Sequence, residues 1–144
     1  MKKILIVVSD YYEKVASGLI KGATEYFDEK DQLLVRDISI KYEIKKVPGA
    51  FEIPFLINKF KDSYDGFLAL GCVIRGETYH FEIISNEVAR KIMDLSIEID
   101  KPIGFGILTC ENLAQAIQRS GPNNKNKGIE AAKACENLLY NKIN

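Results

Sequence analysis

The sequence of 144 residues contains one histidine, three cysteines, no low-complexity tract and no internal repeat. A single histidine excludes any metal site that needs a pair of histidines. The cysteines are odd in number and form no CxxC pair, which argues against a disulfide framework and favours a reducing cytoplasm. No apolar run approaches the roughly 20 residues of a membrane-spanning helix. We therefore expect a cytoplasmic protein with no membrane segment and no metal.

An excess of charge of one sign is also absent, because 20 basic residues balance 20 acidic ones. Nucleic acids and anionic membranes attract proteins with a strong positive field, so neither partner is expected. A net charge near zero gives little self-repulsion and permits close assembly of identical copies. Hydrophobic residues make up 47% of the chain, which excludes intrinsic disorder and predicts one domain over residues 1–144.

Four apolar segments predict β-strands. Residues 4–8, 67–74 and 103–109 are nearly continuous apolar runs, as in strands that are covered on both faces. The fourth segment alternates apolar and polar residues at Ile38, Ile40, Tyr42 and Ile44, which is typical of a strand half open to water. Pro48-Gly49 and Pro102 mark element boundaries.

Apolar residues at helical spacing separate these strands. The predicted helices cover about 13–30, a segment after Gly49, and about 78–99, 112–119 and 126–142. In the second helix, Phe51 and Phe55 with Ile57 or Phe60 are expected to form the apolar side. The alternation of strands and helices predicts an α/β fold, a three-layer αβα sandwich with a four-stranded parallel sheet of the doubly wound, flavodoxin-like type.

Aromatic, acidic and imidazole side chains gather at the predicted strand-to-helix joints. In a doubly wound sheet, ligands bind beyond the carboxyl ends of the strands, where these joints lie. The joints read SDYY (9–12), PGAFE (48–52), RGETYH (75–80) and TCEN (109–112). Any functional site is expected at this edge.

His80, Thr78 and Arg119 are candidates with two interpretations each. His80 is either a general acid or base or simply a polar residue in the first turn of a helix. The segment 76–78 opens that helix, whose free N–H groups suit a phosphate, or Thr78 is an ordinary N-cap. Arg119 follows its strand by a helix that rises about 1.5 Å per residue, roughly 10 Å in all. It therefore either serves a neighbouring copy's site or ends a surface helix.

Other side chains at these joints are equally open to a packing role. Glu52 either accepts hydrogen bonds from ligand hydroxyls or complements a helix dipole. Tyr11 either stacks on a planar ring or packs, and Phe105 belongs to the core if its strand is central. Cys72 and Cys110 have no histidine beside them in the sequence, so nucleophilic catalysis is not expected.

Five segments in this order and spacing resemble the 6,7-dimethyl-8-ribityllumazine synthase family over nearly the whole chain. They are PGAFEIP (48–54), GCVIRGETYHFE (71–82), FGILT (105–109), QAI with Arg119 (115–119) and NKG (126–128). The resemblance implies the penultimate step of riboflavin biosynthesis. In it, 5-amino-6-(D-ribitylamino)uracil condenses with 3,4-dihydroxy-2-butanone 4-phosphate, giving the lumazine, phosphate and water. It implies no cofactor and no metal.

The resemblance also assigns roles by position. His80 is the acid–base residue, and Glu77, Thr78 and Arg119 bind the phosphate. The residues assigned to contacts with the pyrimidine and the ribityl chain are Tyr11, Ala50, Phe51, Glu52, Cys72, Val73, Ile74 and Phe105. In the family each site lies between adjacent subunits of a homopentamer, so the resemblance implies that Phe105 and Arg119 are supplied by the neighbour. A shell of sixty subunits, built from such pentamers, is left open.

Three positions depart from the family pattern. Tyr11 stands where Phe or Trp is common, which keeps stacking and adds a hydroxyl. Tyr79 is bulky beside His80, and Asn123 stands where lysine is usual. Lys125 and Lys127 nearby offer a compensating charge.

Two other functions on the same fold stay open. One is a non-catalytic scaffold protein that binds flavin or lumazine. The other is a riboflavin synthase that dismutates two lumazines, which the combination of His80 and Arg119 disfavours. A response-regulator receiver is excluded, because Gly71 and Cys72 stand where it needs a carboxylate.

Overall fold

The computed structural model describes residues 1–32 and 39–140. Its strands are β1 (Lys2–Ser9), β2 (Ile40–Val47), β3 (Gly66–Ile74) and β4 (Ile103–Cys110). Its helices are α1 (Glu13–Gln32), the 3-10 turn η1 (Ala50–Glu52), α2 (Ile53–Lys59), α3 (His80–Glu98), α4 (Leu113–Gln118) and α5 (Lys127–Tyr140).

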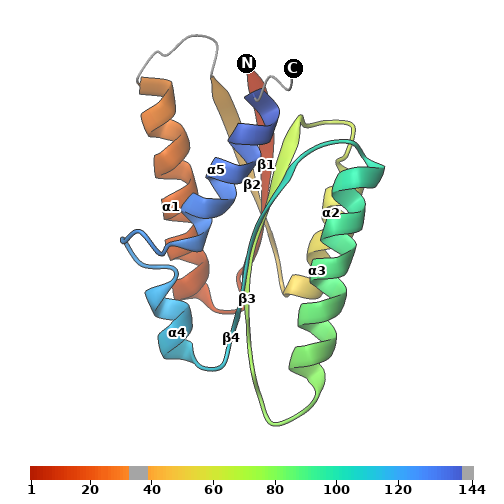
Figure 1. Ribbon diagram of the computed structural model, residues 1–144, viewed down its shortest axis with the longest axis vertical. Coiled ribbons are helices and arrows are strands. Elements are labelled where there is room, and N and C mark those ends of the chain that lie inside the picture. The colour runs from red at the N-terminus through yellow and green to blue at the C-terminus, as the bar shows by residue number, and fades with distance from the viewer. Residues whose placement is uncertain (33–38, 141–144) are drawn as a thin grey trace.

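The strands form one parallel sheet in the order β2-β1-β3-β4. Helices α1, α4 and α5 cover one face of the sheet, and α2 and α3 cover the other (Figure 1). The strand order reverses between β1 and β3, so the crossover through α1 lies on one face of the sheet and the crossovers through α2 and α3 lie on the other. This arrangement confirms the predicted three-layer, doubly wound α/β fold. All four strands end at the lower edge in Figure 1.

Strand β1 lies at the centre of both cores. Ile4, Ile6 and Val8 pack in the layer of α1, α4 and α5, whereas Leu5 and Val7 pack in the layer of α2 and α3. All five side chains are fully buried. A strand that is covered on both faces needs such a continuous apolar run, which confirms the prediction for residues 4–8.

Strand β2 lies at one edge of the sheet and is half open to water, as predicted. Ile40 and Val47 are buried, while Ile44 is 40% exposed. Ile38, which the alternation also included, lies outside the described residues.

Helix α2 buries a different face from the one predicted. Ile53 and Ile57 are fully buried, whereas Phe51 is 64% and Phe55 is 71% exposed. The prediction that these two phenylalanines form the apolar side is therefore wrong. The pairs 51/55 and 53/57 have the same spacing, so spacing alone did not distinguish them; the 3-10 turn η1 contains Phe51 and directly precedes α2.

Helix α3 packs as predicted but begins later. Val88, Ile92 and Leu95 are buried along it. The N-cap position belongs to Tyr79, so the prediction of Thr78 as N-cap is wrong. The Thr78 hydroxyl instead accepts a hydrogen bond from the His80 amide, at a distance of 3.4 Å.

Strand β4 forms the other edge of the sheet, and Phe105 on it is only partly buried against the second core. The condition for a core role of Phe105, a central strand, is therefore not met.

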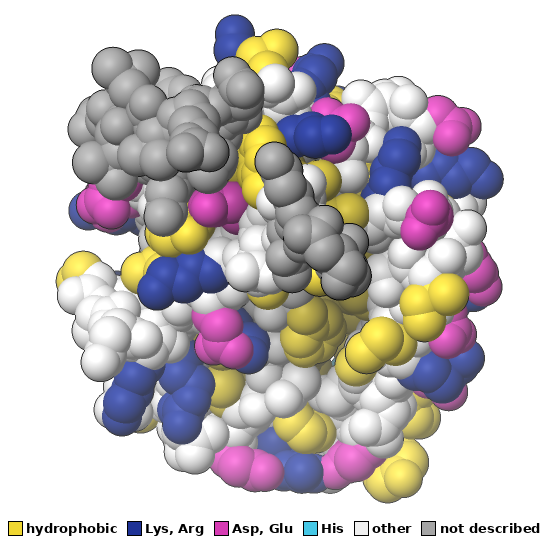
Figure 2. All heavy atoms as spheres, turned by 45° about the horizontal axis from the view of Figure 1, so that its top comes forward, with side chains coloured by type: hydrophobic (Ala, Val, Ile, Leu, Met, Phe, Trp, Pro, Cys, Tyr) yellow, Lys and Arg dark blue, Asp and Glu magenta, His cyan; other side chains and the backbone are white. Residues whose placement is uncertain are grey.

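Figure 2 views the end of the molecule where the strands begin, and basic and acidic side chains intermingle on it. Within residues 1–32 and 39–140, no helix combines the length and apolar character needed to cross a membrane.

Candidate active site

A hollow of about 230 Å³ opens where the strand order reverses, at the carboxyl ends of β1 and β3. It is lined by Tyr11, Tyr12, Gly49, Ala50, Cys72, Val73, Ile74, His80 and Ile84. We call it the His80 hollow. The joints after β1, β2 and β3 all contribute to its wall. Mostly apolar walls with few polar groups are typical of a site for a planar organic ligand.

Two tyrosines from the joint after β1 form one side of this hollow. The rings of Tyr11 and Tyr12 meet edge to face with centroids 4.9 Å apart, and Tyr11 remains 74% exposed. Burial, together with the neighbouring Cys72 and Tyr11, raises the pKa of Tyr12. The Tyr12 hydroxyl therefore keeps its proton at neutral pH and is able to donate it in a hydrogen bond.

The thiol of Cys72 faces the same hollow and is kept protonated. Burial and the adjacent Cys110 raise its pKa to about 12. Since the thiolate is the nucleophilic form, Cys72 is inert at neutral pH. This result agrees with the expectation that the cysteines do not act as nucleophiles.

A second hollow of about 510 Å³ lies along β4. It is lined by Phe105, Ile107, Leu108, Thr109, Cys110, Arg119, Asn124, Lys125, Lys127 and Glu130. We call it the Arg119 hollow. Three cationic side chains, those of Arg119, Lys125 and Lys127, line it together with one carboxylate, that of Glu130. The Glu130 carboxylate pairs with the Lys127 ammonium at 3.0 Å. The excess of positive charge suits a phosphate group.

Asn126 lies in the sequence between Lys125 and Lys127, two residues that line the Arg119 hollow. It is buried, and its oxygen accepts hydrogen bonds from the amides of Gly128 at 2.8 Å and Ile129 at 3.2 Å. Its amide group donates to the carbonyls of Gly18 at 3.1 Å and Gly121 at 2.9 Å. Asn126 therefore caps the first turn of α5 and ties it to α1 and to the preceding loop.

This cap places Lys127 next to Arg119. The Lys127 amide donates a hydrogen bond to the Arg119 carbonyl at 2.8 Å, and both side chains line the hollow. The position of Arg119 is also visible in its effect on Cys110, because the guanidinium partly offsets the rise in that thiol's pKa caused by burial. The sequence analysis considered Lys127 only as a compensating charge. The NKG motif (126–128), which contains Lys127, was the signal that could have identified it as a site residue.

The structure brings together six of the predicted site residues in the His80 hollow: Tyr11, Ala50, Cys72, Val73, Ile74 and His80. Sequence reasoning missed Tyr12, Gly49 and Ile84, which complete its lining. Tyr12 and Gly49 lie in the joints SDYY and PGAFE, which were the available signal, whereas Ile84 has the spacing of a helix core residue.

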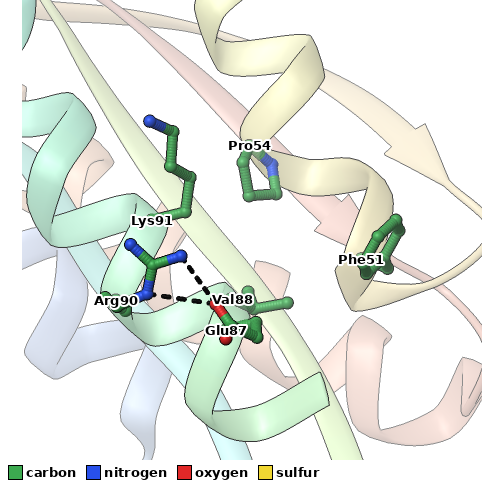
Figure 3. A pocket seen from close by; sticks show the side chains of 6 residues that line it. All are labelled: Phe51, Pro54, Glu87, Val88, Arg90 and Lys91. Atoms are coloured by element: carbon green, nitrogen blue, oxygen red, sulfur yellow. Dashed lines mark hydrogen bonds and ion pairs between the residues drawn. The ribbon is translucent and has the colours of Figure 1, made fainter. Parts of the chain in front are cut away.

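The remaining predicted residues lie elsewhere. Phe105 and Arg119 line the Arg119 hollow, a different one from that of His80. Phe51 lines a groove between α2 and α3, with Pro54 beside it and an ion-paired Arg90 and Glu87 opposite (Figure 3).

Three more predicted residues line neither of the two hollows nor the groove that contains Phe51. Glu77 and Thr78 are exposed in the loop before α3. Glu52 is also exposed, and its carboxylate lies over Gly49, 3.3 Å from where a Cβ of that residue would stand. The Glu52 carboxylate therefore sits at the rim of the His80 hollow, because Gly49 lines that hollow.

Known proteins resemble this chain over almost its whole length. The family model of 6,7-dimethyl-8-ribityllumazine synthase matches residues 1–142. The 6,7-dimethyl-8-ribityllumazine synthase of Bartonella tribocorum is 46% identical over 135 residues, which cover 92% of this chain and 84% of that protein. That of Zymomonas mobilis is 46% identical over 137 residues, 94% and 92% of the two chains. That of Kosmotoga olearia is 41% identical over 132 residues, 90% and 81%. The chain therefore belongs to the 6,7-dimethyl-8-ribityllumazine synthase family.

Proposed function

We propose that this protein condenses 5-amino-6-(D-ribitylamino)uracil with 3,4-dihydroxy-2-butanone 4-phosphate to give 6,7-dimethyl-8-ribityllumazine, in the riboflavin pathway. Membership of the family supports this function. The structural observation that carries it is the pair of hollows. One is apolar and contains His80, and the other is positively charged and contains Arg119. The first suits a pyrimidine ring and the second suits a phosphate.

Positioning supplies most of the proposed catalysis. The pyrimidine stacks on Tyr11, and the backbone of Phe51 and of Val73 and Ile74 pairs with its polar edges. Glu52 at the rim of the hollow accepts hydrogen bonds from the ribityl hydroxyls. The amine is then held against the ketone in a near-attack geometry, which replaces a bimolecular encounter and removes an entropic barrier.

His80 moves the protons in this proposal. It lies at the first residue of α3, exposed toward the hollow. Imine formation, loss of phosphate and ring closure each transfer a proton to or from a reacting oxygen, carbon or nitrogen. A positioned imidazole typically accelerates such steps by about 10²- to 10⁴-fold.

Phosphate binding is proposed for Arg119 and Lys127, with Glu77 and Thr78 in the loop before α3. Charge-assisted hydrogen bonds from Arg119 and Lys127 offset the charge of the departing phosphate. The backbone amides of residues 77 and 78 provide further donors.

We further propose that the two hollows meet between adjacent copies in a homopentamer, so that the Arg119 hollow of one copy closes the His80 hollow of the next. Two observations support this assembly. His80 and Arg119 line separate hollows within one chain, and the large apolar side chains of Phe51 and Phe55 lie exposed on η1 and α2. Native mass measurement distinguishes five copies from a shell of sixty. The buried free thiols of all three cysteines fit the proposed cytoplasmic location.

Of the alternatives, a non-catalytic scaffold protein predicts ligand binding without product. A riboflavin synthase predicts conversion of added lumazine. Neither is favoured by the three relatives above, each of which is named 6,7-dimethyl-8-ribityllumazine synthase.

The test is incubation with both substrates while the absorbance of the lumazine is followed. We expect lumazine from the wild-type protein, and a loss of about 10²-fold or more in kcat for His80→Ala. Arg119→Ala is expected to raise the KM for the phosphate substrate far more than that for the pyrimidine. Absence of lumazine, with both substrates shown to bind, would leave the scaffold function instead.

A further inference from the structure

The loop that leads to His80 makes few contacts of its own. Residues 76–79 are exposed, and a Cβ at Gly76 would meet no heavy atom of the described residues within 4 Å. The helix that follows begins without a side-chain cap. The exposed imidazole of His80 therefore depends on other groups for its position relative to the sheet.

Arg75, the residue directly after β3, connects this loop to two other elements. Its Nε donates to the Glu111 carboxylate at 2.7 Å, in the joint after β4, and its NH1 group pairs with the Glu82 carboxylate in the first turn of α3. Its guanidinium also lies over the Phe81 ring, 4.5 Å from the centroid. The Arg75 amide donates to the Cys110 carbonyl at 2.9 Å, which extends the pairing of β3 and β4 by one residue.

We propose that Arg75 is the positioning residue for His80. This inference rests on the proposed function, since it concerns where the imidazole stands during the condensation. Phe81 and Glu82 follow His80 directly, so a guanidinium that holds both of them fixes the first turn of α3. Glu111 anchors the same guanidinium to the edge of the sheet that carries the Arg119 hollow.

The geometry of the guanidinium explains why arginine is needed here. Its planar fork presents separate N–H donors to Glu111 and to Glu82, while its face stacks on Phe81. A lysine ammonium is a point charge that pairs with one carboxylate well but has no flat face to stack. Arg75→Lys is therefore expected to keep part of the function, and Arg75→Gln to keep little.

The test compares Arg75→Gln, Arg75→Lys and the control Lys21→Gln, which breaks an exposed ion pair with Glu25 on α1. Because a displacement of about 1 Å can cost about 10²-fold, we expect kcat to fall about 10- to 100-fold for Arg75→Gln. The KM for the pyrimidine is expected to change less than about threefold, since the hollow's walls stay in place. Arg75→Lys should recover part of the loss, and Lys21→Gln should match wild type.

A double-mutant cycle with His80 separates positioning from a general loss of structure. In a His80→Ala background, Arg75→Gln should change kcat by less than about twofold, because there is no imidazole left to misplace. The full loss in that background would overturn the proposal, as would an unchanged kcat for Arg75→Gln alone.

Hydrogen exchange supplies a readout that needs no activity. The amides of residues 76–82 should exchange faster in Arg75→Gln than in wild type or Lys21→Gln. If the wild-type protein forms no lumazine, the proposed function fails. Unchanged exchange in this segment would then still overturn the positioning role of Arg75, and faster exchange would support it.

Discussion

The substitution Gly128→Ala tests whether the NKG motif (126–128) holds α5 against α1 and so positions Lys127 in the Arg119 hollow. The Cβ of Gly128→Ala would stand 2.1 Å from the Leu19 carbonyl oxygen and 3.0 Å from the Asn126 side-chain oxygen. The optimal separation between non-bonded heavy atoms is about 3.5–4.0 Å. The Leu19 carbonyl belongs to the backbone of α1 and cannot rotate away. Helix α5 must therefore move off α1, and Lys127 moves with it.

The magnitude follows from two opposing effects. Overpacking of this kind costs typically about 1–3 kcal/mol, and contact with rigid backbone places it at the upper end. Alanine is a better helix former than glycine by about 1 kcal/mol, which offsets part of this cost. We expect a net loss of about 2 kcal/mol, or roughly 4–8 °C in Tm for a chain of this size. The KM for the phosphate substrate should rise as well.

Urea unfolding followed by circular dichroism measures the effect, at one fixed protein concentration because assembly adds to apparent stability. Gly76→Ala is the control, since its methyl group would meet open space among the described residues. We expect the unfolding free energy of the control to lie within about 0.5 kcal/mol of wild type. Equal stability of Gly128→Ala and Gly76→Ala would refute the close packing of α5 on α1.

Two further predictions concern buried groups. Asn126→Ala removes four hydrogen bonds and leaves buried carbonyl and amide groups unpaired. We expect the free energy of unfolding, measured in urea, to fall by about 2–4 kcal/mol. A fall below about 0.5 kcal/mol would contradict the capping role. Burial raises the pKa of Cys135 from 9.0 to about 12. Folding therefore favours the neutral thiol, so its contribution to stability is complete below pH 9 and declines as the pH rises toward 12. Unfolding free energies from pH 8 to 11 should fall less steeply for Cys135→Ala, and identical slopes would contradict this.

The fold was largely predictable because burial and periodicity agree along most of the chain. The run at residues 4–8 has one interpretation, a strand covered on both faces, and the structure confirms it. The phase of α2 was not predictable, because Phe51 and Phe55 have the same spacing as Ile53 and Ile57. The spacing alone does not tell which pair faces the sheet, and the structure shows that Ile53 and Ile57 do.

The candidate site was predictable where it depends on strand ends. The joints after β1, β2 and β3 met in one hollow because parallel strands end at the same edge of the sheet. Lys127 could not be placed from periodicity, since its position beside Arg119 depends on the long-range bond from Asn126 to Gly18. The contact between Arg75 and Glu111 was equally unpredictable, because Glu111 lies 36 residues away in the sequence.

Mixing two inactive variants tests most directly whether the site is shared between copies. His80→Ala and Arg119→Ala subunits are mixed in equal amounts, allowed to exchange, and assayed for lumazine, with native mass confirming mixed assemblies. Independent assortment leaves about one quarter of the interfaces with both wild-type side chains, so activity should recover to about a quarter of the wild-type level. Mixed assemblies that remain as inactive as either variant alone would contradict a site formed by His80 of one copy and Arg119 of the next.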